Sequence, residues 1–422
     1  MHERKFRTYQ NGLVLMIFFT IGFVFMDRLS ITFLFPFIKE DLNLNNAQLG
    51  LITSVLAICF AISGWLFSSI GDVGGKRKKI LVLSTVVFSL CSIFTGVVSS
   101  FILLLFVRSI MGLFEGPVLP LGQAILSYES SPDRRGFNMG LAQSAVGLIG
   151  AALTPIVVTK ISGTSNWHVA FYVVAIPGLL MAFLLWKYLK EPSFVSLHST
   201  NDQTPKKRTS FSDYANGFKH RNVGLSLIMF ALFNTWLFVF TAFAPTYLVE
   251  ADHYSAGDMG IIMAAVGLGS FFWGFLVPMI SDKLGRKPTL IIFSFIACLC
   301  PIVFLFIHAS IAIMVLIGFI TAVGQGCMPL LGFIIISESV PARLAASVGG
   351  MVQGGGELVG GALMPLIAGI LADHIGLTAP LWIASIGSFI AAFIAIGLIE
   401  TAPIKKVKQQ VNSHQVTQLL EE

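Results

Sequence analysis

Long apolar segments recur along the chain, and Lys and Arg fall almost entirely in every second loop between them. Of the 27 Lys and Arg residues, 23 lie in the two tails or in alternate loops, and 2 lie in the other loops. About 20 apolar residues suffice for a helix to cross a membrane, and loops rich in Lys and Arg stay cytoplasmic. The pattern therefore predicts an all-α polytopic membrane protein with both termini in the cytoplasm and an even number of spans.

The composition excludes several classes of protein. Hydrophobic residues make up 55% of the chain, charged residues only 11%, and the mean hydropathy is +0.83. Soluble domains carry about 25% charged residues, so a soluble enzyme, a nucleic-acid-binding domain and a disordered protein are all excluded. Because the basic residues sit in loops, the net charge of +6 indicates contact with anionic membrane lipid and no nucleic-acid partner.

Twelve transmembrane helices are predicted, in two pseudo-symmetric six-helix bundles. Residues 1–190 form the first bundle, 191–221 a cytoplasmic linker, 222–400 the second bundle and 401–422 a cytoplasmic tail. The spans are expected near 10–38, 47–71, 80–100, 101–128, 137–161, 168–190, 222–249, 257–281, 288–308, 309–339, 344–372 and 377–400.

The two halves repeat at an offset of about 210 residues. Six identities fall within sixteen positions, where Gly140, Gln143, Gly150, Ala152, Leu153 and Pro155 align with Gly350, Gln353, Gly360, Ala362, Leu363 and Pro365. Two parallel six-helix repeats are typical of secondary transporters, in which the substrate site lies near the bilayer midplane between the halves.

A short polar motif follows the second span of each half, Asp72–Arg77 and Asp282–Lys287. It resembles the G-x-x-x-D-[RK]-x-G-[RK]-[RK] signature of the major facilitator superfamily, and the likeness covers about residues 10 to 400. The first copy departs from the signature at Ser68 and Val73. The resemblance implies a cytoplasmic latch that holds an outward-facing state, and the alternative is a solvated turn that only sets topology. The gating candidates are Asp72, Arg77, Arg134, Arg135, Asp282 and Arg286.

Five charged residues lie within predicted spans: Asp27, Arg28, Arg108, Glu115 and Glu357. An ionised side chain at the bilayer centre costs about 2.5–3.5 kcal/mol on insertion scales, so these groups must face a polar cavity or one another. Two cations leave one of three carboxylates without a partner, and a desolvated carboxylate can carry a proton near neutral pH. The competing interpretation is an ion-pair network that only fixes helix packing.

Two stretches narrow the resemblance. Asp27-Arg28 in the first span and R-x-x-x-G-x-x-E-G-P from Arg108 to Pro117 are similar to the anion:cation symporter branch, which takes up organic acids. The resemblance implies that Asp27 and Glu115 couple protons and that Arg28 and Arg108 contact the substrate. Glu357 lies outside this pattern and is a third proton-coupling candidate by its charge. Spinster-type lysolipid carriers share a similar pattern, whereas the G-x-x-x-G-P-x-x-G-G motif of drug:proton antiporters is absent from the fifth span.

Polar residues on the later spans complete the predicted substrate site: Gln143, Asn234, Tyr247, Gln325 and Gln353. Gln143 and Gln353 occupy equivalent places in the repeat and are expected to face each other. Each of these residues could instead form a hydrogen bond between helices. The five cysteines all lie in apolar spans, where they are interpreted as small core residues, and no metal or cofactor is expected.

The sequence thus predicts a proton-coupled secondary transporter that works by alternating access, most simply by symport of an organic acid anion. The alternative is an exporter or flippase of an amphipathic molecule, either a drug or a Spinster-type lysolipid, driven by proton antiport. A channel would need rings of like charge or a carbonyl filter, and an enzyme would need a catalytic cluster. The eight histidines lie only in loops, tails or span ends, so no enzyme is expected.

The partners expected are protons, an organic anion and membrane lipid. The predicted location is the bacterial inner membrane, with a monomer as the working unit.

Overall fold

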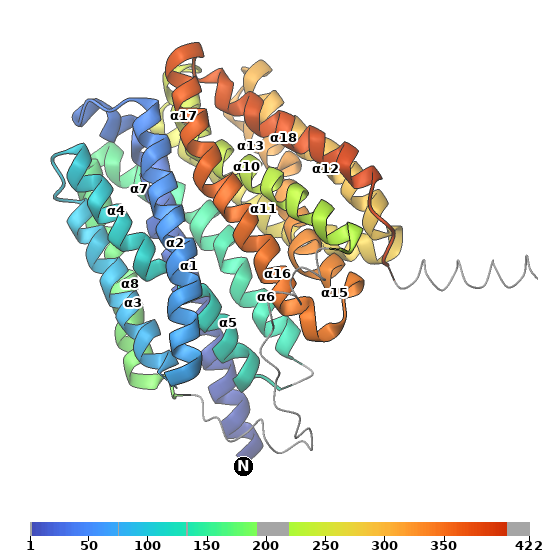
Figure 1. Cartoon of the computed structure of the whole chain (residues 1–422). Helices are drawn as coiled ribbons and strands as arrows, with labels where there is room; N and C mark the ends of the chain where they lie inside the picture. Colours follow the sequence, from blue (N-terminus) through green and yellow to red (C-terminus); the bar gives the residue numbers. More distant parts are fainter. Residues whose placement is uncertain (1, 75, 132–133, 192–218, 403–422) are drawn as a thin grey trace, which may run out of the picture.

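The computed structural model describes residues 2–74, 76–131, 134–191 and 219–402, and every regular element in these ranges is helical (Figure 1). Twelve helical stretches are long and apolar enough to cross a membrane, from Tyr9–Asp41 to Thr378–Ile396. The prediction of an all-α protein with twelve spans is therefore confirmed. Most of the predicted linker and of the C-terminal tail lies outside the described residues.

The first half of the chain supplies six spans. Its elements are α1 (His2–Asp41), α2 (Asn46–Gly74), α3 (Arg77–Thr95), α4 (Phe101–Glu115), α5 (Val118–Glu129), α6 (Arg135–Ala145), the π-helical segment η1 (Val146–Leu153), α7 (Thr154–Thr164) and α8 (Trp167–Tyr188). The fourth span combines α4 with α5, and the fifth combines α6, η1 and α7.

The second half supplies the other six. Its elements are α10 (Arg221–Glu250), α11 (Ala256–Leu284), α12 (Arg286–Phe306), α13 (Ile311–Thr321), α14 (Gly324–Pro329), η3 (Leu330–Ile334), α15 (Ile335–Ser339), α16 (Ala342–Gly356), η4 (Glu357–Leu363), α17 (Met364–Ile375) and α18 (Thr378–Ile396).

Two π-helical segments occupy equivalent places in the sequence repeat. Both η1 and η4 are followed directly by a helix with proline in its first turn, Pro155 in α7 and Pro365 in α17. Proline removes a backbone donor, and a local π turn is one way in which a membrane helix satisfies the backbone groups left free. The repeat therefore has a local structural counterpart, and in the second half the π segment begins at Glu357.

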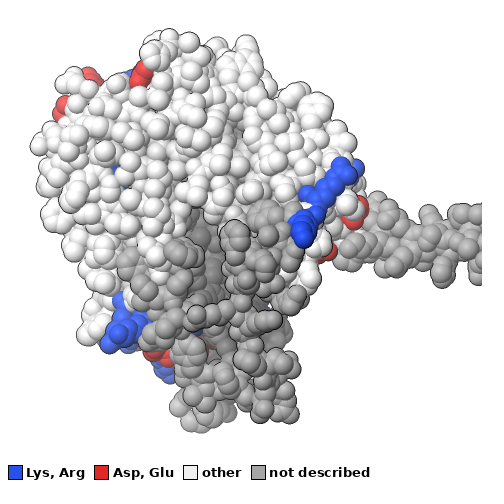
Figure 2. Space-filling model, in the orientation of Figure 1, with Lys and Arg blue, Asp and Glu red and all other residues white. Residues whose placement is uncertain are grey.

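Charged residues lie at the two ends of the bundle. We call the end where α8 finishes and α10 starts the linker face, and the end where α1 finishes and α2 starts the opposite face. On the side of the molecule shown in Figure 2, Lys, Arg, Asp and Glu gather near these two ends, and the band between them is almost free of charge. A charge-free band of this kind suits the hydrocarbon core of a bilayer.

The halves of the chain pack closely where α2 meets α17. A Cβ atom on Gly50 would overlap the backbone oxygen of Pro365, and one on Gly369 would overlap that of Asn46. Glycine at both positions therefore lets the two backbones touch, as small residues commonly do between membrane helices. This contact lies toward the opposite face, because Asn46 starts α2 there.

Candidate functional site

A cavity lies between the two halves, among α1, α2, α4, α10 and η4. Its lining consists of Arg28, Leu29, Ile31, Thr32, Ile52, Thr53, Leu56, Arg108, Phe238, Thr241, Ala242 and Gly361. The first half contributes both arginines, and the second half contributes the last four residues. Secondary transporters bind substrate in such a position, between their two halves.

Arg28 forms an ion pair that joins the two halves at this cavity. Its Nη2 atom lies 2.7 Å from Oε1 of Glu357, and the side chains are only 7% and 18% exposed. Three aromatic rings surround the guanidinium, with centroids 5.7 Å (Phe25), 4.9 Å (Phe60) and 4.7 Å (Phe238) from Cζ. Arginine favours such stacked, partly desolvated positions, so the rings hold the guanidinium in place while it pairs with the Glu357 carboxylate.

Arg108 reaches the cavity from α4 and is completely buried. Its Nη1 donates to the backbone oxygen of Asp27 at 3.3 Å, and its Cζ lies 5.5 Å from the ring centroid of Phe171. Within the described residues, its Nε and Nη2 have no hydrogen-bond partner. Leaving buried donors of a charged group unpaired is costly, so the arrangement favours an added anion beside Arg108.

Two buried carboxylates lie close to these arginines. One oxygen of Asp27 accepts a 2.6 Å hydrogen bond from Ser92, while its other oxygen and both oxygens of Glu115 have no partner among the described residues. The cations whose charges act on Glu115 are Arg28 and Arg108. An ionised carboxylate is expensive to bury, and taking up a proton removes that cost. Of the five intramembrane charges, Arg28 and Arg108 thus line the cavity, and the three carboxylates lie beside these two arginines.

Glu115 owes its position to a break in the fourth span. α4 ends at Glu115, and Gly116-Pro117 separates it from α5. A Cβ on Gly116 would overlap the backbone oxygen of Phe60, so glycine allows α4 to approach α2 at this point. The E-G-P sequence therefore sets both the end of the helix and the depth of the carboxylate.

The polar residues chosen from the later spans lie elsewhere: Gln143, Asn234, Tyr247, Gln325 and Gln353 are absent from the cavity lining. Gln143 is exposed and accepts a 3.4 Å hydrogen bond from Gln123, and Gln353 donates to the backbone oxygen of Gly332 at 3.5 Å. The two glutamines are therefore bonded within their own halves. Asn234 is buried against Gly356 and Gly360 of the neighbouring helix, and Tyr247 is buried near the opposite-face end of α10.

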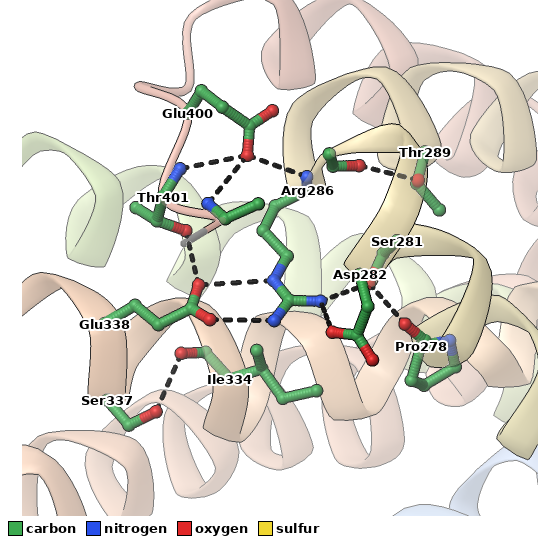
Figure 3. A network of polar contacts seen from close by, with 12 residues as sticks. Pro278, Ser281, Asp282, Arg286, Thr289, Ile334, Ser337, Glu338, Glu400 and Thr401 are labelled. Carbon is green, nitrogen blue, oxygen red and sulfur yellow. Dashed lines mark hydrogen bonds and ion pairs between the residues drawn. The ribbon is translucent and has the colours of Figure 1, made fainter. Parts of the chain in front are cut away.

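At the linker face, Arg286 is the centre of a polar network within the second half (Figure 3). It donates to Asp282 at 2.6 Å, to Ser281 at 2.6 Å and to both oxygens of Glu338 at 2.8 and 3.2 Å. Glu400 accepts hydrogen bonds from the backbone N–H groups of Arg286 and Lys287, so a carboxylate stabilises the start of α12. This network ties the ends of α11, α15 and α18 together.

The first half has a different arrangement at the same face. Arg77 is buried over the ring of Tyr128, 4.3 Å from Cζ to the centroid, and donates to its hydroxyl at 3.3 Å. Arg134 donates to Asn11 at 3.2 Å. The side chains of Asp72 and Arg135, two of the gating candidates, lie outside the described residues.

At the opposite face, polar contacts bridge the halves, and sequence reasoning did not select the residues that make them. Lys39 bonds both oxygens of Glu250 at 2.9 and 2.7 Å. Asp373 accepts from the backbone N–H groups of Asn46 and Ala47 at 2.9 and 2.8 Å, and thereby caps α2 across the interface. In the sequence, the available signal for Lys39, Glu250 and Asp373 was a charged residue at the end of a span. Hydrogen bonds and ion pairs joining the halves, within the described residues, all lie at this face or at the depth of the cavity.

Comparison with solved structures places this architecture among known transporters. A bacterial homolog of the human lysosomal transporter Spinster, in an inward-facing and occupied conformation, has a TM-score of 0.78 at 18% identity, with 92% of this chain and 96% of that chain covered. A mutant of the nucleoside transporter NupG has a TM-score of 0.75 at 16% identity, covering 91% and 99%. At these identities the likeness shows the fold alone.

Sequence comparison reaches transporters of named compounds. A probable 4-methylmuconolactone transporter of Cupriavidus pinatubonensis is 27% identical over 356 residues, which cover 83% of this chain and 81% of that protein. The hexuronate transporter of Bacillus subtilis is 27% identical over 412 residues, covering 91% and 93%. The family model described as Major Facilitator Superfamily matches residues 17–363. The chain therefore belongs to the major facilitator superfamily and is a multi-pass membrane transporter, not an enzyme.

Proposed function

We propose that the protein is a proton-coupled symporter of an organic acid anion and that the anion binds at Arg28 in exchange for Glu357. The observation that carries the proposal is the 2.7 Å contact between Arg28 and Glu357 at the cavity. An internal carboxylate already pairs with the guanidinium, through the kind of charge-assisted hydrogen bond that a substrate carboxylate would also make.

The exchange couples the anion to a proton. When the substrate displaces Glu357 from Arg28, the freed carboxylate remains largely buried without its cation. A buried carboxylate that loses its partner is strongly disfavoured, so a proton binds to it. The anion and one proton together leave the net charge of the cavity unchanged, which is the condition for a low-energy passage through the membrane interior.

Asp27 and Glu115 supply the remaining proton sites. Both are fully buried beside Arg108, and one oxygen of Asp27 and both of Glu115 lack partners among the described residues. Their neutral forms reduce the cost of burial, whereas their charged forms compete with a substrate for the free donors of Arg108. Protonation of either group therefore favours anion binding.

The contacts at the two faces support alternating access. Lys39–Glu250 and Asp373 at the start of α2 hold the opposite face together. The Arg286 network is already formed within the second half, and in the other state it and the other gating candidates would contact the opposite half as a latch at the linker face. With the linker face in the cytoplasm, as the positive-inside rule predicts, the present arrangement is closed to the outside.

The relatives support the same substrate class. The names of the two relatives described above specify transporters of a hexuronate and of 4-methylmuconolactone, both from bacteria. We therefore assign the chain to a bacterial cytoplasmic membrane, with lipid as its surroundings and a monomer as the working unit, since one chain carries both halves of the cavity.

The test uses the purified protein in proteoliposomes with a pH-sensitive dye inside. Sugar acids, aromatic acids and dicarboxylates are added outside, with protein-free liposomes as the control for passive entry of weak acids. Acidification above this control, with one class of carboxylate, supports symport. Silence with every carboxylate, together with a pH response to lipophilic cations or movement of lysolipid, would replace the proposal with the exporter alternative.

A further inference from the structure

The cavity beside Arg28 is poor in free hydrogen-bond donors. Among the described residues, the charged members of its lining are the two arginines, and most of the remainder is aliphatic or aromatic: Leu29, Ile31, Ile52, Leu56, Phe238 and Ala242. Four of these side chains come from α1 and α2 and two from α10, so the apolar surface is built from both halves.

Three threonines provide the hydroxyl groups of the lining, and each hydroxyl proton is already in use. Thr32 donates to the backbone oxygen of Leu29 at 2.7 Å, Thr53 donates to that of Gly50 at 2.8 Å, and Thr241 donates to that of Leu237. A hydroxyl has one proton to donate. These threonines can accept a hydrogen bond from a ligand, but their donors are committed to their own helices.

From this distribution we infer that the substrate is a small carboxylate with an apolar, cyclic body, such as an aromatic or alicyclic acid, and not a polyhydroxylated sugar acid. The inference rests on the proposed function, because it takes Arg28 as the carboxylate-binding group. The carboxylate takes the place of Glu357, and the ring lies against Phe238, Ile52 and Leu56.

Sugar acids fit this lining poorly for a physical reason. Each hydroxyl of a sugar acid brings one donor and acceptor sites, and the cavity can meet only a few of them through the threonine oxygens and Arg108. A hydroxyl buried without a partner loses about tenfold or more in affinity. A ring carboxylate of similar size carries no such groups and gains from contact with the aromatic face of Phe238.

The test measures binding directly, in detergent, because neutral aromatic acids cross liposomes by themselves. Thermal stabilisation and calorimetry of the purified protein are compared for benzoate, cyclohexanecarboxylate, glucuronate and gluconate. We expect both ring acids to bind at least about tenfold tighter than both sugar acids. Arg28→Gln should abolish the binding of every acid.

A second variant tests the apolar part of the cavity lining. Phe238→Leu keeps the side chain apolar but removes the ring. We expect this variant to lower the affinity for benzoate by about threefold to tenfold and to change the affinity for cyclohexanecarboxylate less. Phe106→Leu, at a lipid-facing position that is 61% exposed, is the matched control. Both variants are checked by size-exclusion chromatography before binding is measured.

The outcomes separate this inference from the proposed function. Equal or tighter binding of glucuronate or gluconate would overturn the inference and leave anion transport standing. Absence of binding by all four acids to the wild-type protein, together with a response to lysolipid or a lipophilic cation, would overturn both. A larger loss of affinity for benzoate than for cyclohexanecarboxylate in Phe238→Leu supports the inference. A loss of benzoate affinity in Phe106→Leu as large as that in Phe238→Leu contradicts it.

Discussion

The Arg28 guanidinium and the Glu357 carboxylate are in direct contact at 2.7 Å, although 329 residues separate them in the sequence. Arg28 belongs to α1 and Glu357 opens the π-helical segment η4, so the pair crosses the boundary between the two halves. Arg28 also lines the cavity and directly follows the buried Asp27 in α1. An anion that binds Arg28 therefore alters a contact between the halves as well as the charge of the cavity.

Substitution of Glu357 should uncouple anion binding from pH. In Glu357→Gln the competing charge is gone, so the anion binds more tightly at neutral pH, by about tenfold, and its affinity depends less on pH. The measurement is calorimetry between mildly acidic and mildly alkaline pH. Glu250→Gln is the matched control, because it also removes a carboxylate from an ion pair between the halves but lies at the opposite face. An unchanged pH dependence in Glu357→Gln would contradict the exchange.

Arg28→Lys should weaken anion binding although it keeps the charge. Lysine lacks the planar fork that binds a carboxylate through two parallel hydrogen bonds, and it stacks less well among Phe25, Phe60 and Phe238. We expect a loss of about tenfold or more in affinity. Arg221→Lys, at an exposed position at the start of α10, is the control and should have no effect. Full affinity in Arg28→Lys would show that Arg28 is not the carboxylate site.

Glu115→Gln and Asp27→Asn, which each remove one of the remaining proton sites, should weaken proton-driven accumulation and leave counterflow. Counterflow exchanges labelled for unlabelled substrate and needs no net proton movement, whereas accumulation needs a group that gains and loses a proton. Both reactions are measured in proteoliposomes, with Glu191→Gln at the linker face as the control for loss of a carboxylate. If counterflow disappears too in a correctly folded variant, the residue has a structural or binding role instead.

Loss of the contacts at the opposite face should open that face. Asp373→Ala removes the acceptor for the first N–H groups of α2, and a lost cap costs about 1–2 kcal/mol. Together with Lys39→Gln, which removes the bridge to Glu250, it should lengthen the distance between spin labels at Ser165 and Ser310 in a cysteine-free background. Both label positions are exposed on the opposite face of different halves. Unchanged distances would show that the packing of α2 on α17 alone keeps the face closed.

The Arg286 network should contribute to the stability of the second half. Glu338→Gln leaves the 7%-exposed Arg286 side chain with one fewer charged partner and should lower the stability by about 1.5–3 kcal/mol. Arg134→Gln removes a 3.2 Å bond to Asn11, the side-chain bond of Arg134 within the described residues, and should cost less than about 1 kcal/mol. Thermal unfolding in detergent compares the two. Equal effects would indicate that the network of Figure 3 is not a distinct structural element.

The sequence predicts the fold well because membrane solvation imposes strong rules. The twelve spans follow from apolar length, and the five intramembrane charges, from Asp27 to Glu357, are brought together because hydrocarbon excludes them. Which charges pair cannot be predicted, since Arg28 and Glu357 are neighbours only through the packing of α1 against η4. Polarity alone does not show whether Gln143 and Gln353 face the cavity, because an amide bonded within its own half looks the same in sequence as one that faces a cavity.

Apolar positions were also missed for a physical reason. Phe25, Phe60 and Phe238 are three of 37 phenylalanines, and lipid-facing or core positions account for most residues of this type. Only their positions around the Arg28 guanidinium distinguish them. Asp373 is similar, because a carboxylate at a span end ordinarily marks the membrane boundary, and its role as a cap for α2 depends on contact between the halves.

The most direct test of the account measures anion and proton movement in the same proteoliposomes. Uptake of a labelled carboxylate and acidification of the lumen are recorded together, with the membrane potential clamped to zero, for the wild-type protein and for Glu357→Gln. The account predicts that at least one proton enters with each anion in the wild type and that this ratio falls in Glu357→Gln. Anion uptake without proton entry in the wild type, or an unchanged ratio in the variant, would contradict it.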